Sequence, residues 1–360
     1  MSGTSLDGAD AILASFNPHP HAIGFASIAY PDSLRRQLLD LHHNATGELE
    51  SAALAGIACS RIYAEAIEEL LRVTDTSPGQ VTAIGSHGQT VRHRPELGFT
   101  VQLQNPALLA ELTGIAVVSD FRSRDIAAGG QGAPLAPAFH DAVFRDTEHD
   151  RVVINIGGIS NATMLLRGRA VFGFDCGPGN MLMDAWSQRH LGKPFDDQGA
   201  WAARGKINPS LLDALLAEPY FQVGPPKSSG RDLFNSGWLD RALVAAGAAP
   251  NVAAEDVEAT LLELTARTVA SDVARHARRA EEAFICGGGT ANSRLMARLE
   301  ALMPNLRVAT TEELGVPPMQ VEAMAFAWLA KQTIDDRALD LRTVTGARHP
   351  AVLGAIHPAG

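Results

Sequence analysis

Three glycine-rich turns, far apart in the chain, constrain the fold of this protein more than any other feature of its sequence. They occupy residues 3–8, 155–161 and 286–292, and each lies where a strand-like segment passes to the next element. Because glycine has no Cβ, its backbone N–H groups can crowd around a polyanion, and neighbouring Ser and Thr hydroxyls add donors. One such turn alone is more often an ordinary tight turn. Three of them predict loops that converge on one phosphate-bearing ligand.

The order of elements predicts the fold class. Each half of the chain begins with a strand, a glycine turn and a second strand, and then alternates strands with helices. This order indicates a duplicated α/β layout with a cleft between two lobes. We expect residues 1–135 to form the N-terminal lobe and residues 136–360 the C-terminal lobe. The phosphate-loop motif Gly-x4-Gly-Lys-Ser/Thr is absent from the sequence, which excludes the common NTPase loop.

Size, charge and cysteine content narrow the class of protein. The 360 residues suit two lobes better than one core, and the formal charge of −10 argues against a broad nucleic-acid surface. No apolar run approaches the length of a membrane span, and no secretory signal is visible. The three cysteines lack a metal-binding spacing. We therefore expect neither a nucleic acid nor a membrane as partner, and a reducing cytoplasm as location.

The first glycine turn has almost no strand before it. Only Met1 and Ser2 precede Gly3, whereas a strand usually has about five or six residues. We therefore expect either that the natural first strand begins upstream of Met1 or that this strand is truncated.

Asp175 is the most informative single residue. It follows the apolar segment 171–174, so its carboxylate should emerge at the C-terminal end of a strand, where ligands bind in open α/β sheets. The turn at residues 177–179 leaves space beside it, and Asn180 is placed to cap the next helix. A carboxylate in such a position suits a general base. An Asx-turn, in which Asp175 binds its own turn, is an equally favoured alternative.

A second group of polar residues follows the strand predicted at residues 115–119. Its members are Asp120, Arg122, Arg124 and Asp125. Arginine can bind a carboxylate through two parallel hydrogen bonds, and aspartate can accept from sugar hydroxyls. The alternative is a solvated charge run, which the glycine-rich residues 129–132 make less favoured. The polar segment 227–231 could be a mobile surface loop, and His87 lacks metal partners at useful spacing, which favours hydrogen bonding.

Taken together, the motifs resemble those of the anhydro-N-acetylmuramic acid kinase family. The segments that carry the resemblance, in order along essentially the whole chain, are Gly3-Thr4-Ser5-Leu6-Asp7-Gly8-Ala9-Asp10, Gly85-Ser86-His87-Gly88-Gln89-Thr90, Asp120-Phe121-Arg122, residues 127–135, Asn155-Ile156-Gly157-Gly158, residues 173–180 and Cys286-Gly287-Gly288-Gly289. The family belongs to the hexokinase, actin and heat-shock ATPase group. The resemblance implies two ribonuclease-H-like lobes with mixed β-sheets flanked by helices and a nucleotide cleft between them.

The resemblance also implies a reaction. The substrate would be 1,6-anhydro-N-acetylmuramic acid from peptidoglycan recycling, which ATP and water convert into N-acetylmuramic acid 6-phosphate and ADP. ATP and Mg²⁺ are the implied cofactors, and a homodimer is the implied assembly. Asp7 or Asp10 would hold Mg²⁺ through water, and the sequence does not choose between them.

The same resemblance assigns roles to individual residues, with Asp175 as the catalytic base. The residues expected to bind ATP are Gly3, Thr4, Ser5, Leu6, Asp7, Gly8, Ala9, Asp10, Asn155, Gly157, Gly158, Gly287, Gly288, Gly289 and Glu322. Those expected to bind the sugar are His87, Asp120, Arg122, Arg124, Gly177 and Asn180. Two features depart from the family pattern. Several residues normally precede the first turn, and position 176, often Thr, is Cys here.

Two other functions fit part of the pattern. One is a kinase of the same fold that acts on another sugar, and the other is a chaperone-like ATPase. A plain sugar kinase would not incorporate solvent oxygen at the anomeric carbon. A chaperone-like ATPase would hydrolyse ATP without a small-molecule substrate.

Overall fold

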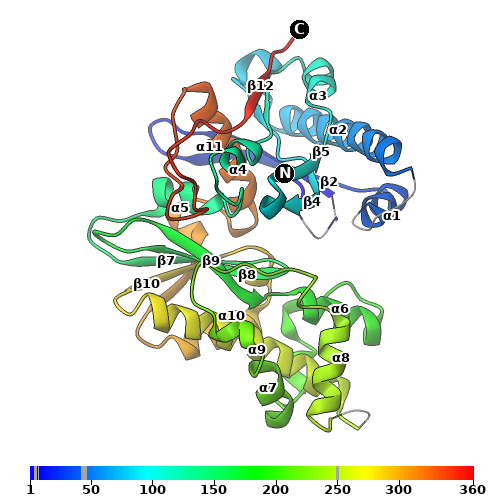
Figure 1. Ribbon diagram of the computed structural model, residues 1–360, viewed down its shortest axis with the longest axis vertical. Coiled ribbons are helices and arrows are strands. Elements are labelled where there is room, and N and C mark those ends of the chain that lie inside the picture. The colour runs from blue at the N-terminus through cyan, green and yellow to red at the C-terminus, as the bar shows by residue number, and fades with distance from the viewer. Residues whose placement is uncertain (4–5, 7, 42–46, 249–250) are drawn as a thin grey trace. The chain divides into compact units, whose positions relative to one another are not determined.

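The chain folds into two compact units. The computed structural model in Figure 1 describes residues 1–3, 6, 8–41, 47–248 and 251–360. The first unit comprises Met1–Val143 together with Gln320–Gly360, and the second comprises Phe144–Met319. The expected C-terminal lobe of residues 136–360 is therefore corrected, because the C-terminal segment packs with the N-terminal residues. The reason is a tertiary pairing, in which strand β12 (Ala355–His357) joins β6 (Val117–Ser119) of the first unit.

The second unit is built on one five-stranded mixed sheet with the order β11-β10-β7-β8-β9. Its strands are β7 (Arg151–Ile156), β8 (Ile159–Leu165), β9 (Phe172–Pro178), β10 (Glu282–Cys286) and β11 (Arg307–Thr310). Strands β7, β8 and β9 pair antiparallel, whereas β10 runs parallel to both β7 and β11. Val152, Val153 and Ile154 are fully buried, as expected for a central strand covered on both faces.

Helices surround this sheet. They are α6 (Met181–Leu191), α7 (Pro209–Leu216), α8 (Ser236–Ala245), α9 (Ala254–His276) and α10 (Ser293–Leu302), with one-turn helices at Asp197–Gly199, Ala202–Arg204, Pro219–Gln222, Gly288–Ala291 and Thr311–Leu314. Helix α9 is buried along most of its length and packs on β8, β9, α6, α7 and α10. Its apolar residues belong to the same core as the strands, which gives the sheet a rigid support.

The first unit contains three separate sheets. Strands β1 (Gly8–Ser15) and β2 (His21–Ala29) form an antiparallel pair, β3 (Ile84–Gly85), β6 and β12 form a sheet with the order β12-β6-β3, and β4 (Gln89–Arg94) and β5 (Phe99–Leu103) form a third pair. The helices are α1 (Asp32–Asp40), α2 (Glu48–Val73), α3 (Pro106–Thr113), α4 (Ser123–Ala127), α5 (Ala136–Phe144) and α11 (Val321–Ile334), with one-turn helices at Pro78–Gln80 and Pro95–Leu97. Helix α5 crosses into the second unit by one residue, and the one-turn helix Pro318–Gln320 spans the boundary between the two units along the chain. Helix α3 begins where the Asn105 side chain accepts the Leu108 N–H and Pro106 occupies the first position.

These observations confirm the predicted α/β class with mixed sheets flanked by helices. Within the part of the chain that the structure describes, no helix is long and apolar enough to cross a membrane. All three cysteines are buried free thiols.

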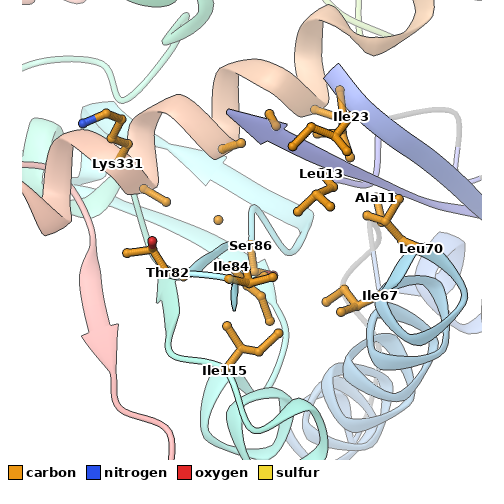
Figure 2. A pocket seen from close by; sticks show the side chains of 18 of the residues that line it. Ala11, Leu13, Ile23, Ile67, Leu70, Thr82, Ile84, Ser86, Ile115 and Lys331 are labelled. Atoms are coloured by element: carbon orange, nitrogen blue, oxygen red, sulfur yellow. The ribbon is translucent and has the colours of Figure 1, made fainter. Parts of the chain in front are cut away.

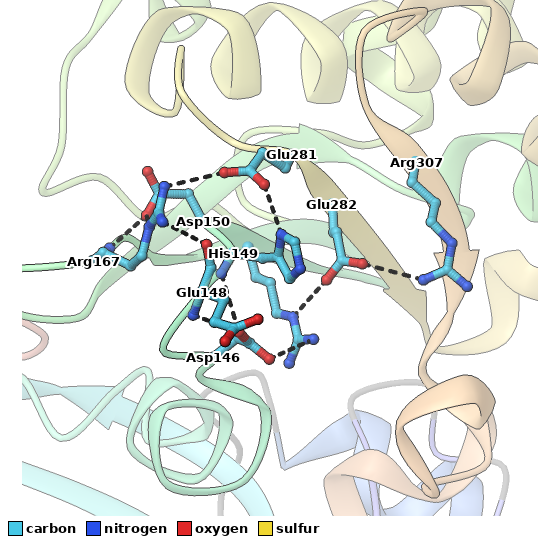
Figure 3. A network of polar contacts seen from close by, with 9 residues as sticks. Asp146, Glu148, His149, Asp150, Arg167, Glu281, Glu282 and Arg307 are labelled. Atoms are coloured by element: carbon cyan, nitrogen blue, oxygen red, sulfur yellow. Dashed lines mark hydrogen bonds and ion pairs between the residues drawn. The ribbon is translucent and has the colours of Figure 1, made fainter.

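The end of the second unit's sheet where β7 and β10 begin carries a network of charged side chains (Figure 3). Arg151 pairs with Asp146 at 2.9 Å and with Glu282 at 2.7 Å, while Arg167 pairs with Asp150 and Glu281. The Arg167–Glu281 pair is exposed, and such a pair contributes about 0–1 kcal/mol, whereas the Arg151 pairs are largely buried. The glycine turns lie at the opposite ends of β7 and β10.

One buried acid makes the stability of the second unit depend on pH. Glu258 on α9 is fully buried, and neither carboxylate oxygen has a hydrogen-bond partner among the described residues. Burial raises the pKa of Glu258 from 4.5 to about 9, with smaller contributions from Asp196 and Asp184. Because the folded state favours the protonated acid, this group destabilises the fold progressively as pH rises from about 4.5 towards about 9.

We therefore predict that Glu258→Gln stabilises the protein at neutral pH. The free energy of unfolding at pH 7 should rise by on the order of 3 kcal/mol and should change little at pH 4.5. Urea unfolding at both pH values measures this difference. An equal effect at the two pH values would show that the ionisation of Glu258 is not the cause.

Candidate functional site

The carboxyl ends of β7 and β9 meet in the second unit through backbone contacts. The Asn180 N–H donates to the Gly157 carbonyl at 2.8 Å, and the Gly179 N–H donates to the Gly158 carbonyl at 2.9 Å. A Cβ at Gly179 would overlap the Gly157 oxygen. The turn after β7 and the turn after β9 are thus held together at a separation that only glycine permits.

The third glycine turn joins the same place. Gly287 follows β10 with a φ of 83°, and a Cβ there would overlap the Asn155 side-chain oxygen and the Ile156 carbonyl. Its N–H donates to the Pro318 carbonyl at 3.0 Å. The structure therefore brings together the second and third glycine turns that the sequence indicated, with Gly157, Gly158, Gly287 and Gly288 only partly buried.

Asn180 differs from its predicted local role. Its side chain makes no capping hydrogen bond to α6, and its backbone is already helical, with φ −82° and ψ −21°. The side-chain amide instead donates to the Ile156 carbonyl at 3.4 Å. Asn180 thus ties α6 to the end of β7, because the close approach of the two turns brings that carbonyl within reach.

Asp175 lies in the middle of β9 and is held by a distant segment. The predicted position at the end of the strand is wrong, because β9 continues to pair with β8 as far as Pro178. Its Oδ2 accepts the Ser229 N–H at 2.9 Å, its own N–H donates to the Lys227 carbonyl at 3.2 Å, and its carbonyl accepts the Tyr220 hydroxyl at 2.8 Å. The bound partner is thus 54 residues away and does not belong to the turn of Asp175 itself. Burial raises the pKa of Asp175 to about 6, while the Ser229 hydrogen bond and the Lys227 charge oppose that rise. The carboxylate is therefore ionised at neutral pH and still basic.

Lys227 is the residue here that sequence reasoning undervalued. Its ammonium is buried, pairs with Asp272 of α9 at 3.0 Å, and lies 5.4 Å from the Phe174 ring and 5.0 Å from the Tyr220 ring. The segment 227–231 is thus not a free surface loop at Lys227. In the sequence, Lys227 is visible only as one lysine in a polar segment. Its burial could not be predicted from that segment, because its partner Asp272 lies 45 residues further along the chain.

Two neighbours of Asp175 shape the space around it. Cys176 is fully buried, and burial raises the pKa of its thiol well above the usual value, so it is not poised as a nucleophile. Gly177 has a φ of 146°, and a Cβ there would lie 2.7 Å from the Phe221 ring. A larger residue at position 177 would therefore displace the Phe221 ring or distort the backbone of the turn.

The first glycine turn is described only in part. Thr4, Ser5 and Asp7 lie outside the described residues. The Gly3 carbonyl accepts the Leu6 N–H at 3.4 Å and the Gln89 side-chain amide at 3.2 Å. Leu6 is buried in a left-handed conformation with φ 60°.

The strand after this turn begins close to its neighbour. A Cβ at Gly8 would overlap the Ile28 carbonyl of β2, so this position requires glycine. Ala9 is buried, and Asp10 is half-buried. Glu322, on the first turn of α11, is exposed and lies within electrostatic reach of Arg122 and Asp10. Asp10 and Glu322 are thus brought near each other within the first unit.

His87 and Arg122 form a direct pair. The Arg122 guanidinium donates through Nε and a terminal nitrogen to His87 Nε2, at 3.1 and 2.9 Å, and through the other terminal nitrogen to the Gly132 carbonyl at 2.7 Å. Burial and the Arg122 charge hold the pKa of His87 well below its usual value, so the ring is neutral. Burial lowers the pKa of Arg122 to about 10, so the guanidinium stays charged at neutral pH.

Asp120 and Arg124 lie in a different setting from Arg122. Together with Ser123 they line a shallow hollow of about 590 Å³. Arg122 does not line this hollow. Asp120 has a φ of 54° and accepts the Ser123 N–H at 3.3 Å, so its carboxylate binds its own turn.

Asp125 has a structural contact that the sequence did not reveal. It is buried and accepts the Gly132 N–H and the Thr345 hydroxyl, both at 2.7 Å. Asp125 therefore anchors the glycine-rich residues 129–132 to the C-terminal segment. The same contacts fix the position of the Gly132 carbonyl, which accepts from Arg122 and orients it.

The glycine contacts lead to a test with an internal control. Gly287→Ala should lower the free energy of unfolding by about 1–3 kcal/mol, because it combines a positive φ with a backbone clash. Gly288→Ala should change it by no more than about 0.5 kcal/mol, because its Cβ would meet nothing closer than the Asn180 side chain at 3.5 Å. Chemical denaturation of both variants measures the difference, and equal losses would contradict this account of the turn.

Comparisons with known proteins give one consistent result. A family model described as anhydro-N-acetylmuramic acid kinase matches residues 1–359. A protein of that name from Variovorax paradoxus (strain S110) is 52% identical over 370 residues, covering 100% of this chain and 98% of the relative. One from Thiobacillus denitrificans (strain ATCC 25259 / T1) is 53% identical over 361 residues, covering 100% and 96%. One from Bordetella petrii (strain ATCC BAA-461 / DSM 12804 / CCUG 43448) is 52% identical over 363 residues, covering 100% and 95%.

Proposed function

The chain belongs to the anhydro-N-acetylmuramic acid kinase family, and from this premise we propose how its own residues perform the reaction. It is an ATP-dependent kinase that opens the 1,6-anhydro ring of anhydro-N-acetylmuramic acid by hydrolysis and phosphorylates O6. The products are N-acetylmuramic acid 6-phosphate and ADP, within the recycling of the cell wall. The matching relatives are named anhydro-N-acetylmuramic acid kinase, which supports this function.

Asp175 is the general base in this proposal. The observation that carries it is a partly buried carboxylate on β9, held by the Ser229 N–H, with a pKa of about 6. A base works best when its pKa lies close to the operating pH, because it is then ionised and still attracts a proton. Asp175 takes a proton from a water molecule as the water oxygen bonds to the anomeric carbon.

One carboxylate suffices because the leaving oxygen has another acceptor. As the bond from the anomeric carbon to O6 breaks, O6 takes the γ-phosphoryl group of ATP, and ADP departs with the electron pair of the broken phosphoanhydride bond. An ordinary inverting glycosidase needs a second carboxylic acid to protonate its leaving group. In the proposed reaction the phosphoryl group replaces that proton, so Asp175 is the one carboxylate that the reaction requires.

The glycine turns are our proposed phosphate-binding elements. Gly157, Gly158, Gly287 and Gly288 are partly exposed at the carboxyl ends of β7 and β10. The Gly157 and Gly287 N–H groups donate to the Ile159 and Pro318 carbonyls, so we propose that the Gly158 and Gly288 N–H groups stabilise charge that develops on the transferred group. Asn155, Gly289 and the first turn complete the set that we expect to hold ATP.

Magnesium binding through Asp10 is part of the proposal. Among the described residues, no group of three or more His, Cys, Asp or Glu side chains could hold a metal ion. Mg²⁺ usually keeps several waters and binds through one or two carboxylates plus the substrate phosphates, so a half-buried Asp10 with Glu322 nearby fits such a site. The metal would supply charge neutralisation at the phosphoryl oxygens, and Asp10 would orient it through water.

The sugar-binding roles rest on the pair formed by His87 and Arg122. His87 and the Gly132 carbonyl hold the guanidinium in place, and one N–H on each terminal nitrogen remains for an anion. A carboxylate such as the lactyl group of the substrate matches that geometry. Asp120, Arg124, Gly177 and Asn180 complete the set of residues that we propose for the sugar. We also propose a homodimer located in the cytoplasm, which mass measurement of the native protein and cell fractionation would test.

The experiment that tests the function uses oxygen-18 water. The enzyme, ATP and anhydro-N-acetylmuramic acid are incubated in H₂¹⁸O at a pH where water exchange of the product is slow, and the product is read by mass spectrometry. One ¹⁸O at the anomeric carbon is expected. A phosphorylated product that keeps the anhydro ring, without solvent oxygen, would contradict the coupled reaction.

We predict that Asp175→Asn lowers kcat/KM by roughly 10²–10⁴-fold, because the amide cannot accept the water proton. ATP affinity should stay within about twofold, and ring opening and phosphorylation should be lost together. Asp240→Asn is the matched control, because Asp240 lies on the surface and pairs only with Arg189. Activity of Asp175→Asn close to that of the control would remove Asp175 from its role.

The pH profile gives a separate test of the Asp175 environment. Activity should fall as pH drops through about 6, because the base must be ionised. Lys227→Met should move this limb to higher pH, since the Lys227 charge lowers the pKa of Asp175. Lys193→Met, at an exposed lysine, should leave it in place.

The stability of the Lys227 variant needs its own control. Lys227→Met leaves Asp272 buried without its cation, which costs about 3–5 kcal/mol. The double variant Lys227→Met with Asp272→Leu removes both charges and should recover much of that stability. The acidic limb of the pH–activity profile should be shifted to higher pH in the double variant also. An unshifted limb in a folded double variant would contradict the role of Lys227.

A further inference from the structure

The glycine-rich loop 129–132 of the first unit is held by the C-terminal segment 345–348. The Gln131 N–H donates to the Thr345 carbonyl at 2.9 Å. The Arg348 N–H and Nε both donate to the carbonyl of the residue directly before the loop, at 2.8 and 3.2 Å. That carbonyl lies 220 residues before Arg348 in the chain. The two segments therefore become neighbours only in the folded protein.

A buried carboxylate joins the loop to this segment. Asp125 Oδ1 accepts the Thr345 hydroxyl and its Oδ2 accepts the Gly132 N–H, each at 2.7 Å. Asp125 is 1% exposed and Thr345 is 4% exposed, so water does not replace either donor. A buried carboxylate is unfavourable unless its oxygens are hydrogen-bonded. Both donors are therefore needed to hold the Asp125 side chain in this place.

The contact is too close for any additional side chain. A Cβ at Gly130 would lie 2.3 Å from Asp125 Oδ2 and 2.7 Å from the Thr345 hydroxyl oxygen. Gly129 has a φ of 90°, and a Cβ there would lie 3.0 Å from Arg348 Nε. Glycine at these two positions lets the loop approach the carboxylate and the C-terminal segment. The position of the loop is thus set by its contacts with that segment.

The same loop supports Arg122. Gly132 receives Asp125 at its N–H and gives its carbonyl to a terminal nitrogen of Arg122 at 2.7 Å. A continuous path of three hydrogen bonds therefore runs from the Thr345 hydroxyl through Asp125 and Gly132 to the guanidinium. The Asp125 charge also acts directly, because with Glu322 it opposes the lowering of the pKa of Arg122 by burial.

We propose that Asp125 and Thr345 are positioning residues for Arg122, and that they determine the preference of this kinase for a sugar that carries a carboxylate. This inference rests on the proposed function, in which Arg122 binds the lactyl carboxylate. Two parallel hydrogen bonds to a carboxylate require the planar guanidinium to be correctly oriented. A displaced Gly132 carbonyl releases that orientation. A neutral substituent on the sugar gains little from the charge-assisted pair and therefore loses little.

The test compares anhydro-N-acetylmuramic acid with its lactyl amide, in which a neutral amide of the same shape replaces the carboxylate. Thr345→Val keeps the shape of the side chain and removes the hydroxyl that Asp125 accepts. The wild-type protein should favour the acid by at least about tenfold in kcat/KM, and Thr345→Val should reduce this preference to about threefold or less. The change should lie mainly in KM for the acid, and kcat/KM for the amide should stay nearly constant.

Three further variants separate positioning from general damage to the fold. Thr345→Ser keeps a hydroxyl and should keep the preference for the acid. Thr343→Val makes the same exchange at an exposed residue of the neighbouring chain and should also keep it. Asp125→Asn offers one acceptor oxygen to two donors, so it should lose the preference as Thr345→Val does. Thermal unfolding of each variant shows that the assays use folded protein.

The possible results distinguish this inference from the proposed function. A wild-type preference that persists in folded Thr345→Val and Asp125→Asn would overturn the inference and leave the proposed function intact. Equal losses for the acid and the amide would also overturn it, because the two residues would then only support the fold. A wild type that uses both sugars equally would reject the lactyl role of Arg122 and the inference with it. The coupled reaction would still stand if ¹⁸O enters at the anomeric carbon.

Discussion

The close approach of backbone at the carboxyl ends of β7, β9 and β10 is the constraint on which the second unit's site depends. At Gly179 and Gly287 the neighbouring backbone or amide oxygen occupies the space of a Cβ, so the three turns can meet only because these residues have no side chain. Their meeting leaves partly exposed glycines at the end of the sheet towards which β9 runs from Asp175. The site is thus a consequence of strand order, since adjacent strands with suitable direction end side by side.

The chemistry of Asp175 depends on a balance between burial and two specific contacts. Burial alone would push the carboxyl towards its protonated form, whereas the Ser229 N–H and the Lys227 ammonium favour the anion. Lys227 is itself held by Asp272 of α9, so the long buried helix takes part in setting the basicity of a residue on the sheet. In our proposal the phosphoryl group captures the departing oxygen, so one base of this kind is enough.

The two units differ in one informative way. In the second unit a complete five-stranded sheet carries the turn of β7, and the rest of the site is arranged around it. In the first unit the place between β1 and β3 is a cavity of about 610 Å³ (Figure 2), and the turn at Gly3 follows a single pair of backbone hydrogen bonds between Met1 and Asp10.

Patterns within short segments of the sequence were enough to predict the α/β class, the meeting of the second and third turns and a strand directly before Asp175. Each of these depends on local chemistry: the missing Cβ of glycine or the apolar run before residue 175. The end of that strand was predicted wrongly, because β9 continues through Asp175 to Pro178. The family was likewise evident from short motifs in order along the chain. The roles of the individual site residues go beyond those motifs and remain proposals.

Only the tertiary structure decided which distant groups complete these local features. The return of residues 320–360 to the first unit, the Ser229 contact of Asp175, the burial of Lys227 against Asp272 and the anchoring role of Asp125 all join residues far apart in the chain. The placement of the Asn180 side chain also followed from the packing of two turns. A sequence specifies which hydrogen-bonding and apolar groups are present, but distant groups become partners only when the sheet order and the helices of the core bring them within bonding distance.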